Sequence, residues 1–271
     1  MEKSVLLTGG AGGLGRATAE RLSDHDWTVF AADLAGEALE STNGIDSVIP
    51  VEMDVTDSRS IAAAVKVVSA ETDALGGVVN FAGINTIGSL IEIGEEALAR
   101  VIDINVMGTF RVNQAFFPLI QAGGGRIINI SSETGYQAGA PFNGPYAMSK
   151  HAIEAYSDSL RRELMFLDIP VIKIQPGPFR TAMVESIERN FDAAIVESEY
   201  FPAVLERVKE LAKEEEKGAH DPAVLAEVVE EALTTSRPRS AYSVRPDKKR
   251  LLLDKFPDSI SDPILKRVLG I

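Results

Sequence analysis

The chain has 271 residues, a mass of 29.1 kDa and a formal net charge of −13 at pH 7. Its 45% hydrophobic and 25% charged residues are ordinary globular values, which excludes disordered, collagen-like and coiled-coil classes. The excess of acidic residues repels phosphate backbones and anionic lipids, so nucleic acid is not expected as a partner.

The sequence contains no cysteine and only three scattered histidines, His25, His151 and His220. Disulfides and cysteine-rich metal sites are therefore excluded, and no metal site is expected. The apolar stretch at the amino terminus is too short for a signal peptide. No apolar run approaches the roughly 18 residues of a membrane span. These observations predict a cytoplasmic protein without a membrane span.

Short apolar runs alternate with longer helical patterns along the chain. The strand patterns cover residues 4–8, 28–32, 48–53, 77–81, 126–131 and 171–175. They are almost entirely apolar, which is typical of strands covered by helices on both faces. The pattern predicts a parallel sheet built from β-α-β units.

The helical patterns cover residues 13–25, 58–72, 95–117, 146–168 and 222–234. Pro118 is expected to end or kink the third of them. No repeat or linker divides the chain, so we predict one α/β domain over residues 1–271, a Rossmann-type doubly wound parallel sheet with helices on both faces. The basic run from Lys248 to Arg250 is interpreted as a surface feature.

A glycine-rich turn follows the first strand and opens the first helix. In this context glycines let the backbone approach a pyrophosphate at a helix N-terminus. Gly10, Gly12 and Gly15 fit the pattern G-x-G-x-x-G, while Gly9, Gly13 and Gly15 fit T-G-x-x-x-G-x-G. Spacing alone leaves both registers open.

Two aspartates end neighbouring strands. Asp33 lies 18 residues after Gly15, where a carboxylate accepts hydrogen bonds from the ribose hydroxyls of NAD and repels the 2′-phosphate of NADP. Its alternative role is to cap a helix that begins after Leu34. Asp54, followed by Val55, is either an adenine contact or an ordinary turn residue. The sequence therefore favours NAD as the cofactor.

Tyr146 and Lys150 are four residues apart on a predicted helix, so their side chains share one face. A free phenol has a pKa near 10, and lowering it by about three units needs roughly 4 kcal/mol. A neighbouring ammonium and an oxidised nicotinamide both favour the phenolate.

Ser131 and Ser132 end the fifth strand, and alternation along the strand favours Ser132 as the side chain facing a ligand.

With these motifs in place, the chain resembles the short-chain dehydrogenase/reductase family from Thr8 to about Val244. The resemblance sets the glycine register on Gly9, Gly13 and Gly15. Asn80 to Gly83 are similar to the family's N-N-A-G, and Asn105 resembles its water-holding helix asparagine. Ser132, Tyr146 and Lys150 match the catalytic serine and Y-x-x-x-K. The cofactor-binding residues that the resemblance implies are Gly9, Gly13, Leu14, Gly15, Asp33, Asp54, Val55, Asn80, Ala82, Gly83, Tyr146, Lys150, Pro176, Gly177 and Thr181.

The chain departs from the family pattern at two positions. Phe81 replaces the second asparagine of N-N-A-G, so a side-chain hydrogen bond is lost there. Ser132 precedes Tyr146 by 14 residues, one more than the commonest family spacing, which predicts a longer loop over the substrate. Asn80 and Thr181 also have alternative roles, as a residue that pins neighbouring strands and as a helix cap, respectively.

The resemblance implies hydride transfer between NAD and a secondary alcohol or ketone. Tyr146 would act as general base or acid, Lys150 would lower its pKa and hold the ribose, Ser132 would position the substrate oxygen, and Asn105 would hold a relay water. A substrate lid is expected at about residues 183–219. Its apolar side chains suggest a lipophilic steroid-, retinoid- or acyl-like substrate: Met183, Val184, Ile187, Phe191, Ile195, Tyr200, Phe201, Val204 and Leu205.

Two other functions stay open from the sequence. An epimerase or dehydratase can use the same fold and residues without net cofactor reduction. A non-catalytic NAD-binding redox sensor is the second alternative, although the intact Ser132, Tyr146 and Lys150 argue against it. The resemblance also implies a homo-oligomer, a tetramer or dimer formed through the helices that carry Asn105 and Tyr146.

Overall fold

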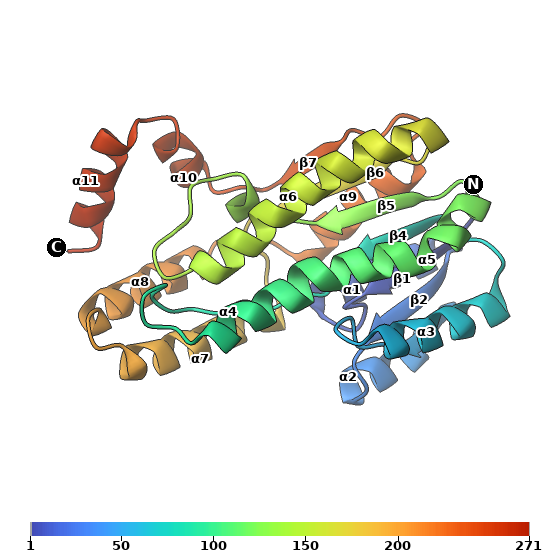
Figure 1. The fold of residues 1–271 in the computed structure, drawn as a ribbon, viewed down its shortest axis with the longest axis horizontal. Coiled ribbons are helices and arrows are strands. Elements are labelled where there is room, and N and C mark those ends of the chain that lie inside the picture. The colour runs from blue at the N-terminus through green and yellow to red at the C-terminus, as the bar shows by residue number, and fades with distance from the viewer. Residues whose placement is uncertain (1, 271) are drawn as a thin grey trace.

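The computed structural model describes residues 2–270, with side chains at all of these positions except 182–185, 215 and 216. Within this range the chain forms a seven-stranded parallel sheet in the order β3-β2-β1-β4-β5-β6-β7 (Figure 1). The strands are β1 (Ser4–Thr8), β2 (Thr28–Asp33), β3 (Val48–Glu52), β4 (Gly77–Asn80), β5 (Arg126–Ile130), β6 (Val171–Pro176) and β7 (Ala241–Val244). The six predicted strands are confirmed; β7 was not predicted.

Alternate side chains of each central strand enter two separate cores. In β1, Leu7 belongs to one core and Leu6 to the other; in β2, Ala31 and Phe30 divide in the same way. Both faces are covered, as the apolar strand patterns predicted. The first core is completed by helices α1 (Gly13–Asp24) and α9 (Pro222–Thr234), which pack against each other.

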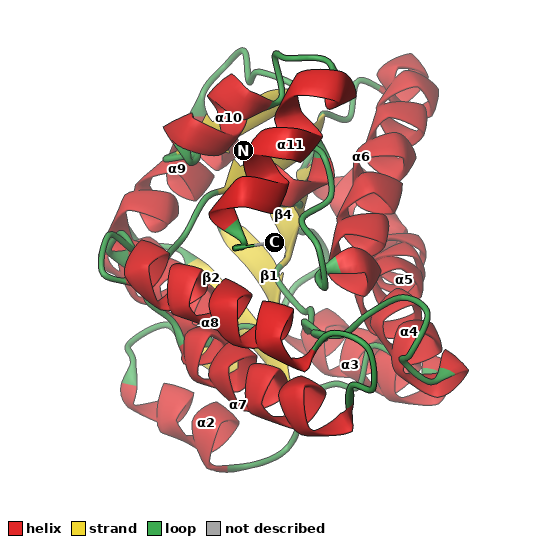
Figure 2. Ribbon diagram, turned by 90° about the vertical axis from the view of Figure 1, so that its left-hand side faces the viewer, coloured by secondary structure: helices red, strands yellow, loops and turns green. Residues whose placement is uncertain are grey.

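The second core is covered by α3 (Ser58–Glu71), α5 (Thr109–Gly123) and α6 (Gly144–Leu164). Figure 2 shows α3, α5 and α6 on one side of the sheet and α9 on the other. The other helices are α2 (Glu37–Glu40), α4 (Glu95–Ile102), α7 (Ala182–Glu197), α8 (Pro202–Glu216), α10 (Lys248–Leu253) and α11 (Asp258–Val268). The doubly wound fold class is thus confirmed.

The helix predicted over residues 95–117 differs from the prediction. It consists of α4, a π-helical stretch Asp103–Gly108, and α5. Pro118 does not end α5, which continues to Gly123 and stops where Gly124 adopts a left-handed φ of 55°. The fully buried Phe116 and Ile120 on either side of the proline explain why packing maintains the helix despite the missing N–H.

The segment after β7 carries two helices that the sequence patterns did not predict, α10 and α11, which extend from the body of the molecule (Figure 1). The interpretation of the basic run as a surface feature was wrong for one residue. Lys248 and Lys249 are exposed, but Arg250 is partly buried and faces Glu133. Among residues 2–270, no helix is long and apolar enough to cross a membrane.

Candidate active site

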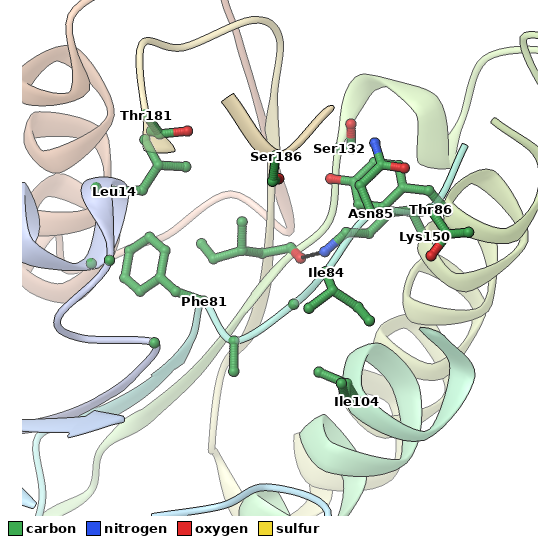
Figure 3. Close-up of a pocket in the computed structure, with 18 of the residues that line it drawn as sticks. Leu14, Phe81, Ile84, Asn85, Thr86, Ile104, Ser132, Lys150, Thr181 and Ser186 are labelled. Carbon is green, nitrogen blue, oxygen red and sulfur yellow. Dashed lines mark hydrogen bonds between the residues drawn. The ribbon is translucent and has the colours of Figure 1, made fainter. Parts of the chain in front are cut away.

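A cavity of about 1380 Å³ opens at the carboxyl ends of β1, β4, β5 and β6. The strand order reverses between β1 and β4, which is where ligands bind in open α/β sheets. Figure 3 shows Leu14, Phe81 and Thr181 towards one end of the cavity and Ser132, Asn85 and Lys150 towards the other. The predicted site residues among its lining are Gly9, Gly13, Leu14, Gly15, Asp33, Asp54, Val55, Ala82, Gly83, Ser132, Tyr146, Lys150, Pro176, Gly177 and Thr181.

The glycine turn leaves no room for side chains at Gly9, Gly10, Gly13 and Gly15. Gly9 has a φ of 65°, and a Cβ there would lie 2.9 Å from the backbone nitrogen of Ala82. A Cβ on Gly13 would lie 2.8 Å from the Cβ of Thr181. Gly10 instead packs on Ala31 of β2. Gly9, Gly12, Gly13 and Gly15 all line the cavity, so the lining includes residues of both registers.

Asp33 lies at the end of β2 and lines the cavity. Its Oδ2 accepts a hydrogen bond from the backbone N–H of Ala11 at 3.1 Å, and its Oδ1 accepts one from Leu34 at 2.9 Å. These bonds fix the carboxylate beside the glycine turn. The alternative helix-cap role was wrong, because the residue at the N-cap of α2 is Gly36.

Asp54 and Asn80 differ in their position relative to the cavity. Asp54 lines it, while its Oδ1 accepts bonds from the backbone N–H and the hydroxyl of Thr56. Asn80 is buried and is not among the lining residues. Its Nδ2 donates to the Oδ1 atoms of Asn113 at 2.8 Å and Asn129 at 3.0 Å. The structure thus places Asn80 in a network that joins β4, β5 and α5, away from the cavity.

The loop after β4 supplies cavity wall. Phe81, where the chain departs from the family pattern, lines the cavity together with Ala82 and Gly83. The backbone N–H of Ala82 donates to the hydroxyl of Thr8 at 3.1 Å. The phenyl ring therefore adds apolar surface beside the glycine turn.

Ser132, Tyr146 and Lys150 meet at the inner end of the cavity. The hydroxyl of Ser132 forms a hydrogen bond with the phenol of Tyr146. The Nζ of Lys150 donates to the backbone carbonyl of Ile130 at 2.9 Å (dashed in Figure 3) and lies 5.4 Å from the centre of the Tyr146 ring. The Oγ of Ser131 lies 3.5 Å from the Lys150 carbonyl oxygen instead, so Ser132 is the serine that meets the tyrosine.

Burial governs the titration of this pair in the cofactor-free protein. Desolvation raises the pKa of Tyr146 to about 12, against the lowering effect of its bond to Ser132, and the charge of Glu133 raises it further. Desolvation also lowers the pKa of Lys150 to about 8, while Glu154 opposes this change. Burial therefore has the largest effect on both groups, and it disfavours the charged form of each.

Asn105 lies in the π-helical stretch and is 1% exposed. Its Oδ1 accepts from the backbone N–H of Ile84 at 2.8 Å, and its Nδ2 donates to the Ile84 carbonyl at 3.0 Å and to Ser149 at 2.9 Å. The hydroxyl of Ser149 in turn donates to the Tyr146 carbonyl at 2.7 Å. Asn105 thus joins the loop after β4 to α6 close to Tyr146.

The P-G turn after β6 follows the family pattern. The backbone N–H of Gly177 donates to the carbonyl of Val244 at 2.9 Å, and Pro176 and Gly177 both line the cavity. Thr181 is the N-cap residue of α7, but its side chain makes no capping hydrogen bond and faces Gly13 instead. The side chain therefore contributes to the cavity wall.

The lid region expected at 183–219 corresponds to α7 and α8. The side chains of Met183 and Val184 lie outside the described residues, whereas Phe191 and Leu205 are buried in a core shared with Ile87. The segment is also attached by polar contacts. Asn190 Nδ2 donates to the carbonyl of Asn85 at 3.0 Å.

Glu92 attaches the turn between α7 and α8 to the loop before α4. Its carboxylate accepts bonds from the hydroxyl of Ser198 at 2.9 Å and the backbone N–H groups of Glu199 and Tyr200 at 2.8 Å each. Sequence reasoning missed Glu92 and Glu133, because a single glutamate in a polar segment gives no periodic or motif signal.

The comparisons agree with this geometry. The sequence profile of the short chain dehydrogenase family matches residues 3–192. Human retinol dehydrogenase 16 is 33% identical over 97% of this chain and 88% of its own length. Human 17-beta-hydroxysteroid dehydrogenase type 6 is 33% identical over 98% and 88%. A solved short-chain dehydrogenase from Streptomyces avermitilis is 27% identical, covers 98% of this chain and 96% of its own, and superposes with a TM-score of 0.77. The chain therefore belongs to the short-chain dehydrogenase/reductase family and is an oxidoreductase acting on CH–OH groups.

Proposed function

We propose that this protein transfers a hydride between NAD(H) and a lipophilic secondary alcohol or its ketone. The observation that carries the proposal is the convergence of Ser132, Tyr146 and Lys150 on the cavity that also contains the glycine turn. One open volume thus joins a dinucleotide cradle to an acid–base group, which is the arrangement that hydride transfer to a carbonyl carbon requires.

The lining residues fit a nicotinamide dinucleotide. Gly9 and Gly13 leave backbone accessible where a Cβ would clash, and Leu14 and Gly15 continue the turn into the N-terminus of α1. Asp33 would accept the ribose hydroxyls and repel a 2′-phosphate, which favours NAD over NADP. Asp54 and Val55 would contact the adenine, while Ala82, Gly83, Pro176, Gly177 and Thr181 would line the nicotinamide half.

The chain's own residues would handle the proton. NAD supplies the hydride acceptor and, in its oxidised form, the positive charge that favours a phenolate nearby. Tyr146 would take the hydroxyl proton during oxidation and return it during reduction. Ser132 would position the substrate oxygen, Lys150 would hold the ribose and favour the phenolate, and Asn105 would position Tyr146 through Ser149.

The substrate class rests on the cavity wall and on the relatives. Beyond the catalytic group, Ile84, Phe179 and Ile187 contribute apolar surface, and Asn85 and Asn190 contribute polar groups. The similar proteins are named for a retinoid and a steroid alcohol. A largely apolar molecule with one reacting oxygen fits this combination.

The test is an absorbance assay for NADH and NADPH with the purified protein and a panel of alcohols: retinol, a 17β-hydroxysteroid, 3-hydroxybutyrate and a polyol. We expect NAD reduction with the 17β-hydroxysteroid, which is the lipophilic secondary alcohol of the panel, while retinol tests whether a lipophilic primary alcohol is also accepted. Turnover of polyols alone would reject the substrate class, and turnover with NADP alone would reject the cofactor. Substrate conversion without net NADH would favour the epimerase or dehydratase, and NAD binding without any conversion would favour the sensor.

The proposal includes a homo-oligomer formed through the helices near the site. Met107, Phe110 and Met148 are 39%, 41% and 47% exposed on the π-helical stretch, α5 and α6, respectively. Light scattering during gel filtration measures the assembly, and a monomer at micromolar concentration would contradict it.

A cytoplasmic location stays a prediction from the cysteine-free composition.

A further inference from the structure

The loop that follows the catalytic serine is tied to the C-terminal part of the chain. We define the 133–143 loop as the residues between Ser132 and α6. Within it, the hydroxyl of Tyr136 lies 2.9 Å from that of Ser243, and the backbone N–H of Ala138 donates to the carboxylate of Asp254 at 3.2 Å. Both partners lie in the segment from β7 to the end of α10, more than 100 residues further along the chain.

Glu133 provides the innermost of these connections. It directly follows Ser132 and is only 8% exposed. Its Oε2 accepts a hydrogen bond from the backbone N–H of Asp247 at 2.6 Å, and its Oε1 lies 3.8 Å from Nη1 of Arg250. A buried carboxylate is costly unless such partners compensate it, so the contact is specific rather than incidental.

Asp247, at the other end of this connection, is also held in place by hydrogen bonds. The carboxylate of Asp247 caps α10 by accepting the backbone N–H of Lys249 at 2.6 Å. The residue whose N–H meets Glu133 is therefore fixed at the start of a helix, as is Arg250 one turn later.

We propose that Glu133 is a positioning residue: its bonds to Asp247 and Arg250 hold the 133–143 loop against the C-terminal segment and thereby hold the Ser132 hydroxyl against Tyr146. The proposal deepens the proposed function and rests on the roles given there to Ser132 and Tyr146.

The geometry explains why the serine side needs this support. Tyr146 is carried by α6 and fixed through Ser149 and Asn105. Ser132 instead caps a single 3₁₀ turn, Glu133–Gly135, and its Oγ accepts the backbone N–H of Thr134 at 3.2 Å. Movement of that turn moves the hydroxyl directly. A misplacement of about 1 Å at a reacting group costs on the order of a hundredfold in rate.

The experiment compares three substitutions of Glu133 in the full-length protein under saturating NAD. Glu133→Ala removes the acceptor, and kcat is expected to fall by at least about tenfold with little change in the KM for NAD. Glu133→Gln keeps an oxygen that accepts the Asp247 N–H, so it should restore most of kcat. Glu133→Asp keeps the charge on a shorter side chain and should also lower kcat. It replaces Glu133→Ala in the comparison if the alanine variant does not fold.

A pH profile separates positioning from a purely structural role. The hydroxyl of Ser132 and the charge of Glu133 act on the Tyr146 phenol, and the Lys150 ammonium lies 5.4 Å from the centre of its ring. The negative charge of Glu133 disfavours the Tyr146 phenolate. In a plot of the rate of alcohol oxidation against pH, Glu133→Gln should therefore shift the acid limb to lower pH. Glu133→Ala removes the same charge and should shift this limb as well, so the difference in kcat between the two variants at high pH measures positioning separately from charge.

Glu230→Ala and Glu230→Gln are the matched controls. Glu230 is another largely buried carboxylate that bridges two elements, because it accepts from Arg21 of α1 at 2.6 Å, but it lies on α9 outside the cavity lining. Its variants should lose stability without losing kcat. Wild-type kcat and pH profile in Glu133→Ala, or a Glu133→Gln variant as slow as Glu133→Ala, would overturn the proposal. High activity of Tyr146→Phe would instead overturn the proposed function on which it rests.

Discussion

The ammonium of Lys150 lies 5.4 Å from the centre of the Tyr146 ring and is bonded to the carbonyl of Ile130. The ammonium therefore stands beside the ring, and its hydrogen bond is directed to the backbone. Desolvation by burial is the largest effect on the phenol, and it raises the pKa of Tyr146 to about 12. We therefore expect the phenol to titrate at lower pH when a positive charge binds in the cavity, which would couple its acid–base role to cofactor binding.

Replacing Tyr146 by phenylalanine tests the acid–base role. Tyr146→Phe removes one oxygen from a helix residue and should lower kcat by about 10²- to 10⁴-fold, the usual contribution of a general acid or base. NAD binding, measured by calorimetry, should persist. Turnover near the wild-type rate would remove the proposed mechanism.

The titration of Tyr146 should depend on the redox state of the cofactor. Its folded pKa of about 12 exceeds the ordinary value of 10.0, so its contribution to stability is complete below about pH 10 and is lost as the pH rises towards 12. Ultraviolet difference titration of wild type against Tyr146→Phe should show no Tyr146 phenolate at neutral pH without cofactor. Saturating oxidised NAD should lower this pKa and NADH should not; equal titration curves in both would contradict the coupling.

Replacing Asp33 should change the choice of cofactor. Asp33→Asn keeps an oxygen for the Ala11 N–H but removes the charge that repels a 2′-phosphate. The ratio of kcat/KM for NAD over NADP should fall by at least about tenfold, which corresponds to roughly 1.4 kcal/mol. Asp46→Asn, an exposed position outside the cavity lining, is the control and should leave the ratio unchanged.

Removing Glu92 should loosen the α7–α8 turn. Glu92→Ala deletes three acceptor contacts to residues 198–200, so that turn should be cleaved faster by limited proteolysis. The KM for a lipophilic alcohol should rise about threefold to tenfold, with an unchanged KM for NAD. Glu95→Ala, exposed in the first turn of α4, provides the comparison; identical proteolysis of the two variants would argue against this attachment.

Local patterns in the sequence determined the sheet, the glycine turn and the candidate residues. Apolar runs such as residues 126–131 report burial on two faces, and the four-residue spacing of Tyr146 and Lys150 is a property of any α-helix. Pro118 shows the limit of such reasoning. A local rule predicted a helix end or a kink there, whereas the helix continues through the proline between the buried Phe116 and Ile120.

Tertiary structure alone decided the contacts between distant segments. Asn80 bonds to Asn113 and Asn129 because β4 lies beside β5. The residues around Asn80 in the sequence do not indicate which strand lies next to β4. Arg250 met Glu133 across more than 100 residues for the same reason. The spacing of residues along the chain determines which side chains share a face of a helix or strand. The pairing of side chains far apart in the sequence depends on how the helices and strands pack.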